Sequence, residues 1–207
     1  YEAFTKGFEH NIIRINYAEN VELYGCDIVA DGVPEDEVHR RISNIDLRSY
    51  WKDVVIDSCM LVNKTYAEAG GAMWIRTGVN GTGGLTVRNC DIEKSCHDEI
   101  IAVFGSGAYA DDIVIENNTI KVDDTSGEYD PSAPIIKFGT SKDHVSNVRF
   151  IGNDVDVAAG SNVLDIEHAN GVTVSGNSFN FNLIKFLTQY TGTDNPSNLV
   201  NGVAFYA

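Results

Sequence analysis

The segment LTVRNCDI, residues 85–92, is one of six copies of an eight-residue frame that decides the fold of this chain. The frame has an apolar residue, any residue, a second apolar residue and any residue. It continues with Gly, Ser or Asn, then Cys or Asn, any residue and a final apolar residue. The other copies keep this spacing: 21–28, 54–61, 113–120, 148–155 and 172–179. Successive copies begin 33, 31, 28, 35 and 24 residues apart. A fixed unit with variable insertions is typical of a solenoid, in which each turn stacks on the previous one.

Each frame predicts two short strands joined by a corner. The first apolar pair alternates with other residues at a period of two, as in a β-strand. Gly and Asn accept the left-handed backbone angles of a sharp turn, so the fifth position predicts the corner. The apolar residue at the eighth position belongs to the second strand.

A third short strand precedes each frame. Two apolar residues flank one outward position in seven segments: 13–15, 45–47, 73–75, 101–103, 136–138, 164–166 and 184–186. The gap to the next frame is 6 or 7 residues in some turns and 10 residues in three consecutive turns. Helical periodicity over more than two turns is absent, so nothing supplies the crossover helices of a doubly wound α/β fold. The sequence predicts an all-β parallel β-helix of about seven turns, each with three short strands.

Composition limits the class of protein and of partner. One domain, residues 1–207, is the natural expectation for this length. The uncapped pattern at both ends leads us to expect a segment of a longer chain that lacks its caps. A net charge of −15 argues against nucleic acid as a partner. No apolar run has the length of a membrane span, so we expect no membrane insertion.

Three of the four cysteines occupy the sixth position of the frame. They are Cys26, Cys59 and Cys90, and later frames place Asn118, Asn153 and Asn177 there. Equivalent positions in stacked turns lie about 4.8 Å apart, which is too close and too regular for a zinc tetrahedron. A disulfide between neighbouring turns fits that distance. The interpretation that we favour is an interior stack of thiols and hydrogen-bonded amides.

The pattern resembles the right-handed parallel β-helix superfamily, which includes pectate lyases, polygalacturonases and phage tailspikes. The resemblance covers nearly the whole chain, and it implies a right-handed, single-stranded β-helix. Residues 89–105, NCDIEKSCHDEIIAVFG, look most like the tailspike and tail-appendage branch. The polygalacturonase motifs are absent except for Asp111-Asp112, and the pectate lyase calcium and arginine motifs are also missing. A pectin-degrading enzyme is therefore not expected.

The resemblance implies that ligands lie across the outward face of the third-strand stack. Outward positions there hold acids, bases and aromatics: Arg14, Asp46, Arg48, Trp74, Arg76, Ala102, Phe104, Lys137, Asp165, Glu167 and Lys185. Trp74 and Phe104 would stack on sugar faces, or else pack under a loop or a partner subunit. Arg76 would bind an anionic group. The expected substrate-binding residues are Trp74, Arg76, Phe104, Lys137, Asp46 and His168.

The segment His97-Asp98-Glu99 is the most charged local cluster of this face. Glycoside hydrolysis uses two carboxyl groups about 6.5–9.5 Å apart for inversion or about 5–5.5 Å apart for retention. Asp165 and Glu167 stand two turns away, which corresponds to about 9–10 Å. The expected catalytic residues are Asp98, Glu99, Asp165, Glu167 and His97, with histidine as a proton shuttle. The competing interpretation is that these acids only solvate a chain with 30 Asp and Glu.

No metal or other cofactor is expected. Acidic loops at 31–37 and 123–130 carry oxygen ligands that calcium accepts, but neither has EF-hand spacing, and both are expected to be solvated loops.

The function expected from the residues and the resemblance is that of a phage tailspike or tail appendage. Such a chain would bind, and cleave, a cell-surface polysaccharide or a teichoic-acid-like polymer, as a homotrimer with other tail proteins on the virion tail or outside the cell. The enzyme class expected is a glycan-degrading hydrolase or lyase. Two alternatives remain open: a secreted bacterial polysaccharide lyase or hydrolase, and a non-catalytic structural or adhesive β-helix.

Overall fold

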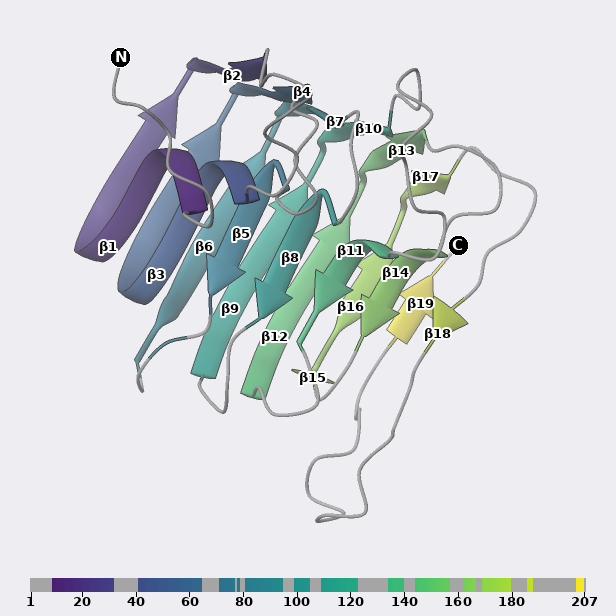
Figure 1. Ribbon diagram of the computed structural model, residues 1–207. Helices are drawn as coiled ribbons and strands as arrows, with labels where there is room; N and C mark the ends of the chain where they lie inside the picture. Colours follow the sequence, from purple (N-terminus) through teal and green to yellow (C-terminus); the bar gives the residue numbers. More distant parts are fainter. Residues whose placement is uncertain are drawn as a thin grey trace.

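The computed structural model describes residues 9–31, 41–64, 71–76, 78, 81–94, 99–104, 109–122, 134–139, 144–156, 162–166, 169–179, 186–187 and 204–206 (Figure 1). Within these ranges the named elements are all β-strands, and their pairings are parallel. The all-β parallel solenoid expected from the frame is therefore confirmed. The handedness of the coil, the count of about seven turns and the three strands of each turn stay predictions.

The described strands form two sheets that run along the solenoid (Figure 1). The thirteen strands of the larger sheet within the described residues are β1 (Glu9–Tyr24), β3 (Arg41–Asp57), β5 (Met73–Arg76), β6 (Gly83–Arg88), β8 (Ile101–Phe104), β9 (Tyr109–Glu116), β11 (Pro134–Phe138), β12 (His144–Ile151), β14 (Asn162–Ile166), β15 (Ala169–Asn170), β16 (Thr173–Ser175), β18 (Phe186–Leu187) and β19 (Ala204–Tyr206). The smaller sheet, counted over the same ranges, has six: β2 (Asp27–Asp31), β4 (Met60–Lys64), β7 (Asp91–Lys94), β10 (Thr119–Val122), β13 (Asp154–Asp156) and β17 (Ser178–Phe179).

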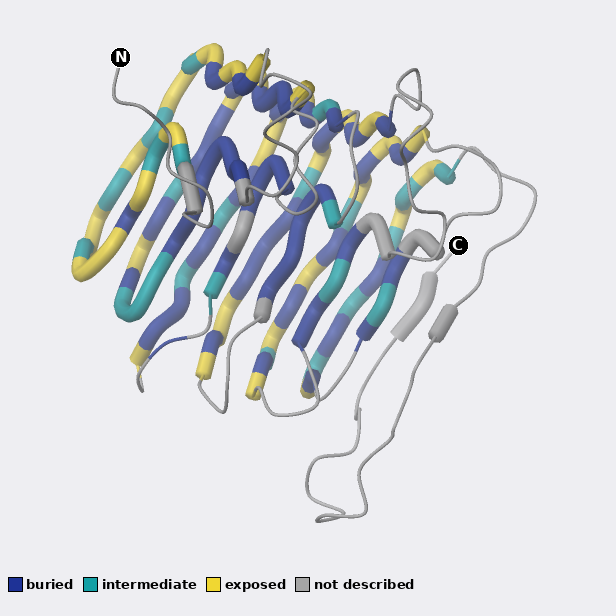
Figure 2. The backbone as a smooth tube through the Cα atoms, viewed as in Figure 1, coloured by how far each residue is buried: buried dark blue, intermediate teal, exposed yellow. Residues whose placement is uncertain are grey.

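The frame sets the register of both sheets. Its first apolar residues pair across four successive turns, and all four are 0% exposed: Val54, Leu85, Ile113 and Val148. Its final apolar residues pair in the same way in the smaller sheet: Ile28, Leu61, Ile92, Ile120 and Val155. Buried and exposed positions therefore alternate along the strands (Figure 2). Each apolar side chain stacks on its equivalents in the neighbouring turns and forms a continuous core.

In the later turns the strand before the frame is separate from the first strand of the frame. In the first two turns the two are one continuous strand. Strands β1 and β3 each continue through the bend into the frame. In both strands the chain stays extended and bends at single residues with positive φ, Tyr17 and Asn20 in β1 and Ser49 and Asp53 in β3. The longer connections after Ile75, Val103 and Phe138 separate the two strands instead.

Two positions of each turn adopt the left-handed backbone conformation. The fifth frame position does so in all six copies, with φ between 53° and 66°: Gly25, Ser58, Asn89, Asn117, Gly152 and Gly176. The predicted corner is therefore confirmed. The residue just before each frame does the same, with φ between 52° and 74°: Asn20, Asp53, Gly84, Asp112, Asn147 and Gly171. Only Asn, Asp and Gly occur there, the residues that tolerate this conformation best, and sequence analysis missed this second corner.

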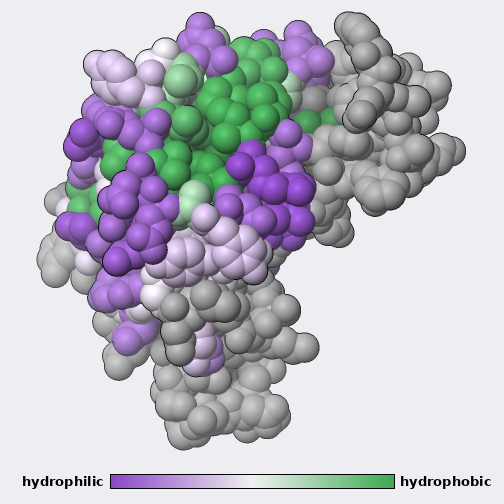
Figure 3. Space-filling view, turned by 90° about the vertical axis from the view of Figure 1, so that its left-hand side faces the viewer, coloured by the Kyte–Doolittle hydropathy of each residue, from purple (hydrophilic) through white to green (hydrophobic). Residues whose placement is uncertain are grey.

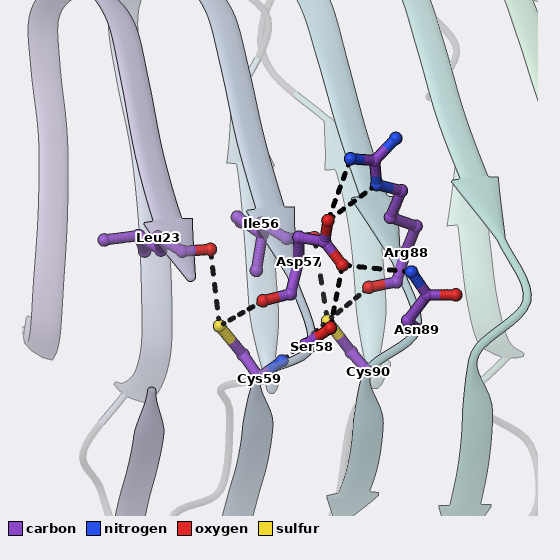
Figure 4. Close-up of polar contacts among 8 residues, drawn as sticks. All are labelled: Leu23, Ile56, Asp57, Ser58, Cys59, Arg88, Asn89 and Cys90. Atoms are coloured by element: carbon purple, nitrogen blue, oxygen red, sulfur yellow. Dashed lines mark hydrogen bonds and ion pairs between the residues drawn. The ribbon is translucent and has the colours of Figure 1, made fainter. Parts of the chain in front are cut away.

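The sixth frame position forms an interior ladder of thiols and amides. Each side chain accepts the backbone N–H of the equivalent residue one turn earlier and donates to a carbonyl of that earlier turn. Asn118 Oδ1 accepts from Cys90 N at 2.9 Å, and its Nδ2 donates to Val87 O at 3.1 Å. Cys90 Sγ accepts from Cys59 N at 3.4 Å and donates to Ile56 O at 3.6 Å (Figure 4).

These cysteines have a structural role. Cys26, Cys59 and Cys90 are free thiols, so the interior stack is confirmed and the disulfide alternative is excluded for these three. Burial raises the pKa of the Cys90 thiol to about 11, which keeps it protonated and unreactive at neutral pH.

A polar cluster lies on the outer side of the same corner. Asp57 accepts hydrogen bonds from Asn89 Nδ2 at 3.0 Å, from Ser58 Oγ at 3.0 Å and from Arg88 Nε at 2.8 Å (Figure 4). Hydrogen bonds from Asn89 and Arg88 lower the pKa of Asp57. The ionised carboxylate thus joins two neighbouring turns at the corner.

The end of the solenoid at β1 exposes apolar side chains between polar ones (Figure 3). Ile13, Val21 and Leu23 on β1 pack against the core but are only partly buried. Ile15 of the same strand is 5% exposed. Among the described residues, no helix has the length and apolar character needed to cross a membrane.

The pairing of β18 differs from expectation. Lys185 was expected level with Asp165, but the structure pairs Leu187 with Asp165 and Phe186 with Leu164. A shift of two residues leaves the same faces inward, so the apolar period alone could not detect it.

Candidate functional site

The candidate site lies on the outward face of β1, β3, β5, β8, β11 and β14, which stand side by side (Figure 1). Arg14, Asp46, Trp74, Ala102, Lys137 and Asp165 are in register on successive strands. This is the line of outward residues expected from the sequence. Of the predicted site residues, His97, Asp98, Glu167 and His168 lie outside the described residues. The described parts of Trp74 and Phe104 are their backbones.

Asp46 is the centre of a cluster of positively charged groups. Its Oδ2 accepts from Asn11 Nδ2 at 3.0 Å and lies 3.6 Å from Arg14 Nε. Arg48 Nε donates to the same oxygen at 2.5 Å, and Arg76 Nε donates to Oδ1 at 3.1 Å. We call Asn11, Arg14, Asp46, Arg48 and Arg76 the arginine cluster. Three guanidinium groups from three neighbouring strands therefore contact one carboxylate.

The register of the sheet builds this cluster. Arg14 pairs with Asp46 across β1 and β3. Leu47 pairs with Ile75, which places Arg48 and Arg76 level with each other on β3 and β5. All three arginines are therefore within one turn of Asp46, at a rise of about 4.8 Å per turn.

The cluster is less accessible than the sequence suggested. The side chain of Asp46 is fully buried, whereas those of Arg48 and Arg76 are 24% and 20% exposed and that of Arg14 is 44% exposed. Ala102, also expected to be outward, is 1% exposed. Outward orientation at Asp46 and Ala102 therefore does not mean contact with solvent.

The electrostatics of the cluster fit a role in orientation. Burial raises the pKa of Asp46, while Arg76 and Arg14 act in the opposite direction. Burial and the neighbouring charge of Arg76 lower the pKa of Arg48. Because both oxygens of Asp46 already accept hydrogen bonds from guanidinium groups, Asp46 is suited to position the arginines rather than to accept a proton from a substrate.

Lys137 and Asp165 form a second charged pair on the same face. Lys137 Nζ lies 3.6 Å from Asp165 Oδ2, and the two side chains are 22% and 15% exposed. Asp165 Oδ1 is buried and has no hydrogen-bond partner. Burial raises the pKa of Asp165, with Lys137 opposing that change. A half-buried carboxyl group with a raised pKa has the property required of a general acid.

Glu99 does not lie beside Asp165. Its backbone carbonyl accepts a hydrogen bond from the buried Lys94 Nζ at 3.3 Å, and it precedes β8 by two residues. It is three residues before Ala102, which is itself two strands from Asp165. This offset corresponds to about 14 Å between the Cα atoms of Glu99 and Asp165. Asp46 is four strands from Asp165, or about 19 Å.

Sequence analysis missed part of this surface. Asn11 lies two residues before Ile13. It is outside the apolar pair Ile13 and Ile15 from which the outward position of this turn is predicted. Arg14 and Arg48 were recognised as outward but were not selected as binding residues, although counting turns would have placed both beside Asp46. The described residues contain no group of three or more His, Cys, Asp or Glu able to hold a metal ion. The acidic segments 32–37 and 123–130 lie outside the described residues.

Comparison of the chain with protein-family models, with curated proteins and with solved structures gives no match.

Proposed function

We propose that this chain binds and cleaves an anionic cell-surface polymer, a polysaccharide or a teichoic-acid-like chain, as part of a phage tailspike or tail appendage. The proposal includes a right-handed β-helix of about seven turns with three strands each, a homotrimer with other tail proteins, and a location on the virion tail or outside the cell.

The arginine cluster carries the proposal. In a chain of net charge −15, three guanidinium groups converge at one point on a line of stacked strands. Guanidinium groups bind carboxylate and phosphate through paired N–H donors. Because the chain as a whole is acidic, a polyanion would be attracted to this local concentration of positive charge more than to the average surface. Asp46 holds the three side chains together and so reduces the entropy that they would lose on binding.

Lys137 and Asp165 are proposed to act further along the same face. Asp165 would donate a proton to the leaving oxygen, as its raised pKa favours, and Lys137 would attract the anionic group of the next repeat.

Binding without cleavage is the second candidate function. The observation in its favour is that, among the described residues of this face, no second Asp or Glu has its Cα within about 10 Å of the Asp165 Cα by register. The proposed enzyme needs a second carboxylate, for which Asp98 and Glu167 remain the candidates.

The binding test uses immobilised polygalacturonate and poly(glycerol phosphate). We expect binding to at least one polymer, weakened about tenfold in Arg14→Ala and in Arg76→Lys and falling with added salt. Arg76→Lys keeps the positive charge but removes the paired N–H donors of the guanidinium group. It therefore separates the contribution of bidentate hydrogen bonding from that of charge attraction. Lys121→Ala, an exposed cation on the smaller sheet, is the control. Unchanged binding in both arginine variants, with native melting temperatures, would refute the proposed site.

The cleavage test measures release of reducing ends or phosphate from the polymer that binds. Activity that is lost in Asp165→Asn, while binding remains, supports the enzyme. Binding with no release in the wild-type chain supports the adhesive alternative, and release that is unaffected in Asp165→Asn shows that another residue is the acid.

A further inference from the structure

A second candidate binding site lies on the strands of the frame, away from the arginine cluster. A depression of about 510 Å³ is lined by Asp111, Asp112, Asn147, Arg149, Gly171 and Thr173. These residues come from β9, β12 and β16 and from the turn before β16. The volume lies within the range of sites that bind small molecules, about 300–1,000 Å³.

The second left-handed corner shapes this depression. Pairing of β9 with β12 stops after Asp111 and Ser146 and resumes at Ile113 and Val148. Between them, Asp112 bends the chain with φ of 52°, so Asp111 and Asp112 are both exposed instead of alternating in and out. Two consecutive carboxylates therefore face solvent at one point of the sheet.

Asn147 and Gly171 continue the corner on the next two turns. A Cβ atom at Gly171 would lie 3.0 Å from Asn147 Oδ1, which is tighter than an ordinary contact. The missing side chain keeps the floor of the depression open beside the Asn147 amide.

The polar groups of the depression are held in place by one another. Asp111 Oδ1 accepts hydrogen bonds from Ser146 Oγ at 2.7 Å and from Asn147 Nδ2 at 2.8 Å. Arg149 Nη2 lies 3.4 Å from Asp112 Oδ1. These contacts use one oxygen of each carboxylate, which leaves the second oxygens, the other N–H groups of Arg149 and the Thr173 hydroxyl as acceptors and donors that a ligand could use.

An aromatic pair lies near the depression, outside its lining, at the start of β9 and β12. The rings of Tyr109 and His144 are stacked, with centroids 5.1 Å apart and planes inclined by 19°. Tyr109 is 46% exposed and lies two residues before Asp111 on β9, about 7 Å along the strand. Amphipathic aromatic groups beside fixed donors and acceptors provide both apolar contact and hydrogen bonds.

The charge of the depression selects among ligands. Two carboxylates and one guanidinium give it a net charge of −1, which disfavours an anionic group. Pairs of donors and acceptors at fixed positions match the vicinal hydroxyl groups of a sugar. From this chemistry we infer that the depression binds a neutral saccharide unit. The inference goes beyond the proposed function and does not depend on the arginine cluster.

The test is calorimetric titration of the intact chain with four neutral probes: maltotetraose, cellotetraose, chitotetraose and mannotetraose. We expect at least one to bind with Kd below about 10 mM, because an open polar site gives weak affinity. That affinity should fall about tenfold in Asp111→Ala and in Arg149→Ala. Lys52→Ala is the matched control. Lys52 is exposed and occupies the position equivalent to Asp111 two strands away in the same sheet, since Lys52 pairs with Gly83 and Gly83 pairs with Asp111.

NMR chemical shifts give a second measurement if a variant folds poorly. The bound sugar should shift the signals of Tyr109, His144 and Thr173 in the wild-type chain, and it should bind Lys121→Ala, changed on the smaller sheet, with unchanged affinity. Three results would overturn the inference: no binding by any of the four sugars, binding by both depression variants that is as tight as that of the wild type, or tighter binding of tetragalacturonate or of calcium chloride alone at this place.

Discussion

Replacing Asn118 by alanine should destabilise the chain strongly, because this side chain joins three turns of the solenoid. Asn118 is 2% exposed. Its Oδ1 accepts from Cys90 N, and its Nδ2 donates to Val87 O and to Asn153 Oδ1 at 3.0 Å. Asn153 Oδ1 would keep its second donor, the Asn118 backbone N–H at 3.0 Å. Alanine therefore leaves the buried Cys90 N–H without its side-chain acceptor and removes one donor from the carbonyl of Val87, which also belongs to the β6–β9 ladder.

The magnitude follows from these two groups. A buried polar group left without a hydrogen bond costs about 1–3 kcal/mol. Together with about 1 kcal/mol for the donor that the Val87 carbonyl loses, the expected loss in the free energy of unfolding is about 3 kcal/mol, a large share of the total stability of a domain. The small cavity left by the amide adds to this cost.

The chain itself supplies the matched variant. At the equivalent position one turn earlier, a thiol makes both bonds at longer distances: Cys90 Sγ accepts from Cys59 N at 3.4 Å and donates to Ile56 O at 3.6 Å. Asn118→Cys should therefore lower the free energy of unfolding by less than half as much as Asn118→Ala does. Asn170→Ala, at an exposed position of β15, should change stability by no more than about 0.5 kcal/mol.

Urea unfolding followed by circular dichroism at pH 7 measures all three variants. If Asn118→Ala lies within about 1 kcal/mol of the wild type, the ladder does not stabilise the fold as argued. If Asn118→Cys is no more stable than Asn118→Ala, the thiols are not equivalent members of the ladder.

Three further predictions concern pH and backbone strain. Hydrogen bonds lower the pKa of Asp57, so the wild type should be more stable than Asp57→Asn at pH 7, and urea midpoints should converge as the pH falls below about 4. Burial raises the pKa of Asp165, so Asp165→Asn should be more stable than the wild type at pH 7; that gain should vanish below about pH 4, and a less stable variant at pH 7 would contradict it. Gly25→Ala should cost about 1–2 kcal/mol for the left-handed geometry alone, because nothing lies within 4 Å of a Cβ there. Gly84→Ala should cost more, because a Cβ there would lie 3.2 Å from the backbone N of Asp53 and would also displace the Asp53 carboxylate; thermal melts that give equal losses would refute this contact.

The fold could be predicted from the sequence because the frame is a local pattern with a fixed register. Six copies without an inserted residue imply that equal frame positions stack, and the pairing of Leu85 with Ile113 follows directly. The interior position of Cys59 and Cys90 follows from the same count. The second corner, at Asp112 and its equivalents, also has a signal in the sequence, because Asn, Asp or Gly precedes every frame.

The candidate site was only partly predictable. The line from Arg14 through Asp46 to Asp165 follows from register, because outward positions are as regular as inward ones. The burial of Asp46 does not follow, because it depends on the long arginine side chains of three turns that cover one short side chain. The depression near Asp111 arises from a bend that exposes two consecutive residues, and a strict period of two cannot represent it.

The ladder and the arginine cluster are linked through the register of the strands. Each corner side chain bonds both to an N–H and to a C=O of the preceding turn, so a turn cannot slide past its neighbour without breaking two bonds. A slip of one residue would turn Asp46 toward the core and move Arg14 and Arg76 away from it. Thiol and amide corners hold the same register, and outward residues can therefore change without altering the core. The cluster is specific for this reason: its three charges belong to separate turns, and only an unslipped solenoid brings them to one carboxylate.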